Sequence, residues 1–150
     1  MKKFLYLPDR LLARRADLGL LTLRIAVGVI FAAHGASKLF DKGVGNVAKG
    51  FDGLGIPLPA ISAYLATFTE FAGGLMVIAG VLTRWISVPL AFTMVVAFLF
   101  VHKDGGFFLP KGAEYVFFLF LTTVSLLFTG AGRYSVDALL MKKCGACKAD

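Results

Sequence analysis

Three ionisable side chains, Arg24, His34 and Lys38, lie within one apolar stretch near the N-terminus. A charge inside a membrane span is costly unless it is paired or hydrated, so each one marks a candidate site. At about 100° per residue, Arg24 and Lys38 fall on one stripe along the helix surface, and His34 lies beside that stripe. The stripe comprises Arg24, Gly28, Phe31, Gly35 and Lys38. Because small residues let helices approach closely, we predict that this stripe faces another helix rather than lipid.

Glu70, in the second apolar stretch, could neutralise one of these cations. We align the two stretches as antiparallel helices with Phe40 level with Ala60. Glu70 then lies about 6 Å along the axis from His34 and about 9 Å from Arg24, at roughly 1.5 Å per residue. A guanidinium can donate two parallel hydrogen bonds to one carboxylate. We therefore predict an Arg24–Glu70 ion pair. Such a pair could be structural or could take part directly in function.

A polar cluster is expected toward the outer side of the membrane, because several chemically active groups converge there. These groups are an imidazole, an ammonium, a carboxylate and a phenol. Together they can bind a polar headgroup and transfer protons. The predicted ligand-binding residues are His34, Lys38, Glu70, Arg24, His102, Glu114 and Tyr115. For His102 and Glu114 the alternative is that they order the loop between the third and fourth stretches.

Both cysteines lie in Cys144-Gly145-Ala146-Cys147, close to the C-terminus. A dithiol at this spacing, among basic neighbours, could exchange disulfides. It could also supply half of a zinc site, whose other two ligands would have to come from another chain. The third alternative is a functionally silent tail. We predict no metal site within this chain.

The composition shows what kind of scaffold positions these groups. Of 150 residues, 58% are hydrophobic and 17% are charged, and the mean hydropathy is +0.80. Long apolar runs of this kind indicate a membrane protein and exclude the disordered, collagen-like and disulfide-scaffold classes. Spans of roughly 20 residues leave room for one compact bundle and no second folded domain.

The sequence predicts an all-α fold, an integral membrane four-helix bundle. The expected spans cover about residues 18–40, 60–82, 85–101 and 113–128, with a glycine-rich loop over 41–60. A short interfacial helix is expected over 8–17, and Ser135 is expected to cap a small helix that begins near Val136. The predicted domains are a basic leader (1–17), the membrane domain (18–140) and a tail (141–150).

The distribution of the cations predicts the topology. Ten Lys and Arg residues lie in the two ends of the chain and in the short connection at Arg84. The opposite loops hold four, namely Lys42, Lys49, Lys103 and Lys111. The positive-inside rule then places both termini in the cytoplasm, for a multi-pass protein of the inner membrane. The first span is too long for a cleavable signal peptide. In this setting the net charge of +7 indicates orientation, not nucleic-acid binding.

Four blocks of the sequence resemble the DoxX family of small four-helix membrane proteins, over about Leu18 to Leu140. The blocks are LRIAVGVIFAAHGASKLF, GLGIPLPAISAYLATFTEFAGGLMVIAGVLTR, VHKDGGFF with the later Glu114-Tyr115, and TGAGRYSVDALL. The residues that fall on the family's polar and glycine positions are Arg24, His34, Gly35, Lys38, Glu70, Gly73, Gly74, His102 and Tyr115. The Lys111-Gly112-Ala113 segment departs from the family's glycine-rich pattern, and the cysteine tail lies outside the shared core.

The resemblance implies a link to redox chemistry at the membrane. The related DoxD is a subunit of a thiosulfate:quinone oxidoreductase, and the similar MauE proteins assist the maturation of a disulfide-rich enzyme. A fold-level resemblance does not by itself assign a reaction.

Three hypotheses follow from the sequence and the resemblance. The first is a redox-associated subunit that binds a quinone or a similar headgroup in the polar cluster, with electrons supplied by a protein partner. The second is a noncatalytic scaffold or assembly factor, possible as a homo-oligomer, whose basic tail recruits a partner complex. The third is a small-solute transporter, although inverted repeats are not evident.

Overall fold

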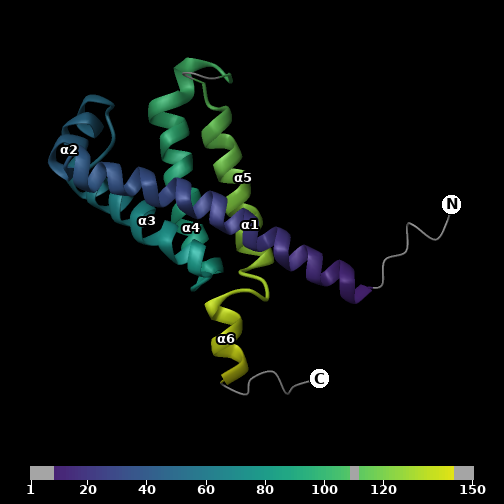
Figure 1. Cartoon of the computed structure of the whole chain (residues 1–150). Helices are drawn as coiled ribbons and strands as arrows, with labels where there is room; N and C mark the ends of the chain where they lie inside the picture. The colour runs from purple at the N-terminus through teal and green to yellow at the C-terminus, as the bar shows by residue number, and fades with distance from the viewer. Residues whose placement is uncertain (1–8, 109–111, 144–150) are drawn as a thin grey trace.

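The computed structural model of the chain describes residues 9–108 and 112–143, and these residues form helices joined by short connections (Figure 1). The predicted all-α class is thereby confirmed. The α-helices are α1 (Asp9–Ala36), α2 (Val44–Gly53), α3 (Pro59–Ala79), α4 (Thr83–Ala97), α5 (Glu114–Thr129) and α6 (Val136–Lys143). Two π-helices, η2 (Ser37–Asp41) and η3 (Phe98–His102), extend α1 and α4, and a 3₁₀ turn, η4 (Lys103–Gly105), follows η3.

Helix α1 combines the basic leader with the first span. It begins at Asp9 and runs without a break into η2, which ends at Asp41. The short helix expected over residues 8–17 is therefore continuous with the span from Asp9 onward. The leader is rich in Leu, Ala and Arg, which are good helix formers, so nothing in its sequence ends the helix.

Glycines fix how closely α1 and α3 pack and in what register. A Cβ atom added to Gly35 would lie 2.3 Å from the backbone nitrogen of Phe71. A Cβ atom on Gly74 would lie 2.4 Å from the backbone nitrogen of Ala32. Backbone atoms cannot move aside as flexible side chains can, so only glycine permits this approach. The prediction that the Gly35 stripe faces another helix is confirmed.

Helix α2 lies where the sequence predicts a glycine-rich loop, and that prediction is wrong. Val44 and Val47 of α2 are buried against Ala63 of α3, and Phe51 packs on the same cluster. These side chains recur at helical spacing on one face of α2. The glycines in this segment weaken a helix by roughly 0.5–1 kcal/mol each, and packing on α3 offsets that cost. Figure 1 shows α2 at the end of α1, beside the start of α3.

Helices α4 and α5 form an antiparallel pair that completes the core (Figure 1). The chain leaves α3 through Gly80, which has a φ of 71° and a left-handed conformation that glycine adopts without strain. The main core cluster joins α1, α3, α4 and α5. Its buried members are Val27, Phe31, Val77, Leu90, Met94, Val116, Leu119 and Leu126.

Three helices in the described part of the chain are long and apolar enough to cross a membrane. They cover Arg15–Asp41, Pro59–Ala79 and Thr83–His102. The sequence predicts four spans, and the fourth corresponds to α5, an apolar helix of 16 residues. At 1.5 Å per residue α5 is about 24 Å long, shorter than the roughly 30 Å of a hydrocarbon core. Large apolar side chains point outward, as lipid contact requires; Phe92 is 66% exposed.

Helix α6 begins where the sequence predicts a small terminal helix. Its first residue is Val136, and the hydroxyl of Ser135 accepts a hydrogen bond from the backbone N–H of Ala138 at 3.1 Å. This is the geometry of a serine N-cap. The expected cap is therefore confirmed.

Candidate functional site

A buried ion pair joins α1 to α3 on the side of the bundle near α2. The ammonium Nζ of Lys38 lies 2.5 Å from Oε1 and 2.6 Å from Oε2 of Glu70. The side chain of Glu70 is 6% exposed, whereas that of Lys38 is 22% exposed. The carboxylate thus depends on the ammonium for its stabilisation, because little solvent reaches it. The ammonium keeps some access to the surface.

The ion pair between Arg24 and Glu70, which we predicted from the sequence, is not formed. The glycine contacts place Gly35 opposite Phe71 and Ala32 opposite Gly74. Glu70 is therefore level with position 36, about six residues, or roughly 9 Å, from the position that aligning the span ends gave. Lys38 lies within reach of Glu70 in this register, whereas Arg24 is about 18 Å away along the helix axis.

Arg24 instead binds backbone carbonyls at the other end of the bundle. It is 1% exposed. Its guanidinium donates to the carbonyls of Val77 and Ile78, both at 3.0 Å, twice to that of Tyr134, at 3.0 and 3.1 Å, and to that of Ala131. These five bonds use all five N–H groups of an arginine side chain. Arg24 therefore fastens the last turn of α3 to the segment after α5 and has no donor left for a ligand.

His34 and Tyr115 face each other between α1 and α5. Their ring centroids are 6.1 Å apart, with the planes tilted by 35°. The ring nitrogen Nδ1 of His34 lies 2.9 Å from the carbonyl oxygen of Ile30, one turn earlier in α1. His34 is exposed and Tyr115 is half-buried. If Nδ1 donates to this carbonyl, Nε2 of the neutral ring can accept a hydrogen bond, so the imidazole and the phenol form a pair that can bind a ligand at the protein surface.

His34, Lys38 and Asp41 follow one another at intervals of about one turn along α1 and η2; we call them the polar stripe. A cleft of about 510 Å³ lies between the end of this helix and α2. Its lining residues are Lys38, Asp41, Lys42, Asn46, Val47, Gly50, Phe51 and Leu54. Lys38 thus contributes both to the ion pair and to the cleft. The sequence analysis missed Asp41 and Asn46, although the spacing of Asp41 from His34 and Lys38 continues the stripe.

Thr67 adds a buried hydroxyl one turn before Glu70 on α3. It is fully buried, and its Oγ1 has no hydrogen-bond partner among the described residues. A buried hydroxyl without a partner is uncommon, because losing its hydrogen bonds to water costs free energy. Thr67 and Glu70, three residues apart, occupy neighbouring positions on one face of α3.

His102 and Glu114 lie at the two ends of the connection between α4 and α5. His102 ends η3 and Glu114 begins α5, and both side chains are half-buried. The hydrogen bonds and the ring contact given above involve Lys38, Glu70, His34 and Tyr115, but neither of these two residues. The structure thus brings four of the predicted site residues into two contacts, Lys38–Glu70 and His34–Tyr115, while His102 and Glu114 each have an interaction partner of their own.

The Cys144 and Cys147 pair lies outside the described residues, so its role stays a prediction. Within residues 9–108 and 112–143, no three His, Cys, Asp or Glu side chains gather in a way that could hold a metal ion. The polar stripe, with Glu70 and Tyr115, provides hydrogen-bond donors, hydrogen-bond acceptors and groups that can transfer protons.

Comparison with known proteins places this chain in a family. The family model described as DoxX matches residues 19–103. CatD of Bacillus subtilis, provisionally named an oxidoreductase, is 32% identical over 84% of this chain and 90% of its own length. The inner membrane protein YqjF of Escherichia coli is 33% identical over 85% of this chain and 95% of its own. The membrane protein Rv3486 of Mycobacterium tuberculosis is 31% identical over 93% and 92%. No solved structure matches the chain.

Proposed function

The chain belongs to the DoxX family of membrane proteins, and from this premise we propose that it is a redox-associated inner-membrane subunit that binds a quinone headgroup. The headgroup would bind at the polar stripe, between His34, Lys38 and Tyr115. The observation that carries the proposal is the Lys38–Glu70 ion pair, buried beside an exposed imidazole that faces a phenol.

The donors at this site fit a quinone headgroup. A quinone presents two carbonyl acceptors on an apolar ring, and the Tyr115 phenol and the Lys38 ammonium supply donors. The Glu70 carboxylate accepts hydrogen bonds at 2.5 and 2.6 Å from the Lys38 ammonium, which holds that donor in place beside the headgroup. A bound quinone would supply two-electron chemistry, with two protons taken up for two electrons received from a partner oxidoreductase. The imidazole of His34 has one ring nitrogen that donates and one that accepts a hydrogen bond, so this side chain can pass a proton to a bound quinone.

The names of two relatives each support one part of this proposal. One of them, CatD, carries a provisional oxidoreductase name, and another, YqjF, is an inner membrane protein. We extend both features to this chain as part of the proposal. Cytoplasmic placement of both termini and four crossings complete it, with α5 as the fourth span. Arg15, Arg84 and Arg133 lie near one end of the bundle, in agreement with the positive-inside rule.

A second candidate is a scaffold or assembly factor for a partner complex. One observation favours it: all five donors of Arg24 bind backbone carbonyls, so this buried cation fixes the helix ends and does no chemistry. If Lys38 and Glu70 likewise serve only to hold α1 against α3, the bundle would be a rigid platform. The two candidates differ in whether a small molecule binds at the polar stripe.

The test is mass spectrometry of the small molecules retained when the whole protein is extracted into native lipid discs. We expect a quinone to copurify with the unaltered protein. His34→Ala should reduce its retention about tenfold, the effect of losing one hydrogen bond worth roughly 1.4 kcal/mol. Because His34 is exposed, this variant should remain folded. Tyr115→Phe provides a second variant that leaves the core intact.

The matched control is Lys49→Ala combined with Asp52→Ala. Both residues are exposed on α2, so the change removes one cation and one carboxylate near the site without touching the stripe. The control should retain the quinone. Equal retention by the unaltered protein, by His34→Ala and by Tyr115→Phe would overturn the proposal and favour the scaffold.

A further inference from the structure

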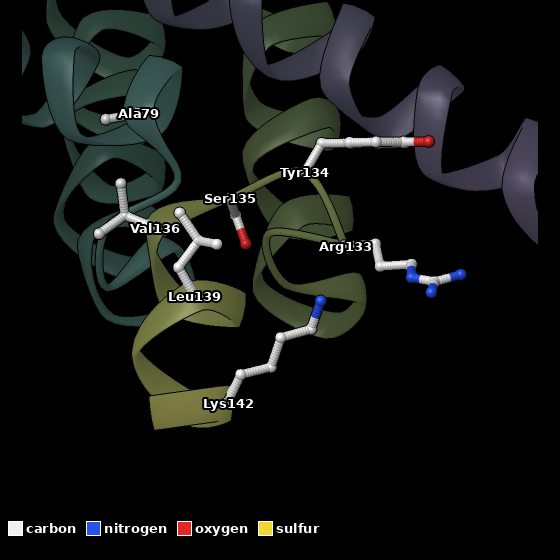
Figure 2. A pocket seen from close by; sticks show the side chains of 7 residues that line it. All are labelled: Ala79, Arg133, Tyr134, Ser135, Val136, Leu139 and Lys142. Carbon is white, nitrogen blue, oxygen red and sulfur yellow. The ribbon is translucent and has the colours of Figure 1, made fainter. Parts of the chain in front are cut away.

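A groove with basic and apolar walls lies at the end of the bundle opposite the Lys38–Glu70 pair. Its volume is about 690 Å³, and it is formed by the end of α3, the segment after α5 and α6 (Figure 2). Ala79, Val136 and Leu139 form its apolar part, and Arg133 and Lys142 supply two cations. None of its lining residues is acidic. We call it the basic groove.

The hydrogen bonds around the basic groove hold its walls in place. Arg24 fixes the segment after α5 through the carbonyls of Ala131 and Tyr134. A carboxylate oxygen of Asp17 accepts a hydrogen bond from the backbone N–H of Arg133 at 3.0 Å. The groove is thus part of the fold and not a loose terminal segment.

The carboxylates of Asp17 and Asp137, near the groove, accept hydrogen bonds from backbone amides. Within the described residues, they form no ion pair with the groove cations. The two oxygens of Asp137 accept hydrogen bonds from the N–H groups of Leu82 and Thr83, at 2.9 and 3.2 Å. In the described part of the chain, the side chains of Arg133 and Lys142 form no hydrogen bond or ion pair, and both are exposed. The groove therefore attracts an anion.

Helix α6 carries exposed apolar side chains next to these cations. Leu139 is 59% exposed, and Leu140 and Met141 are each 54% exposed. Consecutive residues of a helix point in different directions, so α6 has apolar surface on more than one side. Such a helix is stable in the interface between lipid tails and headgroups. Figure 2 shows Lys142 extending from α6 toward the segment that carries Arg133 and Ser135.

The groove lies level with the ends of two candidate spans. The candidate spans end or begin at Ala79 and Thr83, and Ala79 itself lines the groove. We propose that the basic groove binds an anionic phospholipid, with its phosphate between Arg133 and Lys142 and an acyl chain along Val136 and Leu139. An acidic protein would satisfy the cations, but it would not cover the apolar surface on the several sides of α6.

The experiment uses the whole protein in lipid discs that contain equal amounts of phosphatidylglycerol and phosphatidylcholine. Native mass spectrometry counts the molecules of each lipid that remain bound. Direct hydrogen bonding of each groove cation to the bound phosphate contributes roughly a fivefold preference, about 1 kcal/mol, beyond the general attraction of an anionic surface. Arg133→Gln combined with Lys142→Gln should therefore lower the preference for phosphatidylglycerol about 25-fold.

The matched control is Arg15→Gln combined with Arg84→Gln. It removes two exposed cations from the same end of the bundle, outside the groove, and it should keep the preference. Three outcomes would overturn the proposal: no preference in the unaltered protein, an equal loss in both variants, or an unchanged preference in the groove variant. Copurification of an acidic protein that is lost only in the groove variant, with lipid binding unchanged, would also overturn it.

Discussion

The Lys38–Glu70 ion pair predicts an asymmetry between the two substitutions that break it. Lys38→Met leaves a carboxylate that is 6% exposed, whereas Glu70→Gln leaves an ammonium that is 22% exposed. Removing one partner of a buried pair costs about 3–5 kcal/mol of unfolding free energy. We expect a cost in that range for Lys38→Met. For Glu70→Gln we expect about 2 kcal/mol, because solvent reaches Lys38 and the amide oxygen still accepts a hydrogen bond.

The double variant tests whether the two residues act as a pair. With both charges removed, neither is left unpaired, so Lys38→Met with Glu70→Gln should cost less than Lys38→Met alone. The coupling energy should be about 3 kcal/mol, at the upper end of the range found for residues in contact. Arg24→Met with Glu70→Gln is the matched comparison. Those sites are about 18 Å apart along the helix axis, so their effects should add to within roughly 0.5 kcal/mol.

The assay is equilibrium unfolding in mixed micelles of a mild detergent and SDS, followed by circular dichroism. All variants are compared at one pH and one protein concentration. The reasoning would be refuted if Glu70 coupled to Arg24 and not to Lys38. It would also fail if Glu70→Gln proved the more damaging change, since the burial of the two side chains predicts the opposite order.

Three further predictions follow from the same structure. Gly35→Ala should destabilise the protein by about 1–3 kcal/mol, because its Cβ would meet the backbone of Phe71. By contrast, a Cβ atom on Gly19, in the same helix, would meet open space, so Gly19→Ala should stabilise the protein by roughly 0.5–1 kcal/mol. Equal effects of the two substitutions on the free energy of unfolding in mixed micelles would contradict the close approach of α1 and α3. Arg24→Lys should cost about 2–4 kcal/mol in that assay, because three donors replace five, and a loss below about 1 kcal/mol would contradict its role. Asp137→Ala should cost about 1 kcal/mol, since it removes the acceptor at the start of α4, and an unchanged thermal midpoint would contradict that.

The apolar runs were sufficient to predict where the long helices lie. The predicted second span, 60–82, and third span, 85–101, match α3 and α4 to within a few residues. Turn chemistry located the ends, as Ser135 does for α6. Local propensity failed for α2, where glycines suggest a loop. There the packing of Val44 and Val47 on α3, a tertiary effect, stabilises the helix.

The partners of the buried charges were harder to predict, because they depend on register. Aligning the ends of the two spans ignores α2. Because α2 packs on the first turns of α3, helix α3 is displaced along α1 relative to that alignment. The glycines carried the missing information, since Gly35 and Gly74 must each meet backbone at close range. The carbonyls that bind Arg24 could not be predicted, because a free carbonyl at a helix end has no signature in the side-chain sequence.

Cross-linking with a photoreactive quinone analogue tests the central claim most directly. The analogue would be added to the whole protein in lipid discs, irradiated, and the adducts mapped by peptide mass spectrometry. A quinone site at the polar stripe predicts adducts within residues 34–41 or at Tyr115, which an excess of unlabelled quinone suppresses. Adducts confined to the outward face of α4, around Val88 and Phe92, and unaffected by that excess, would contradict the claim.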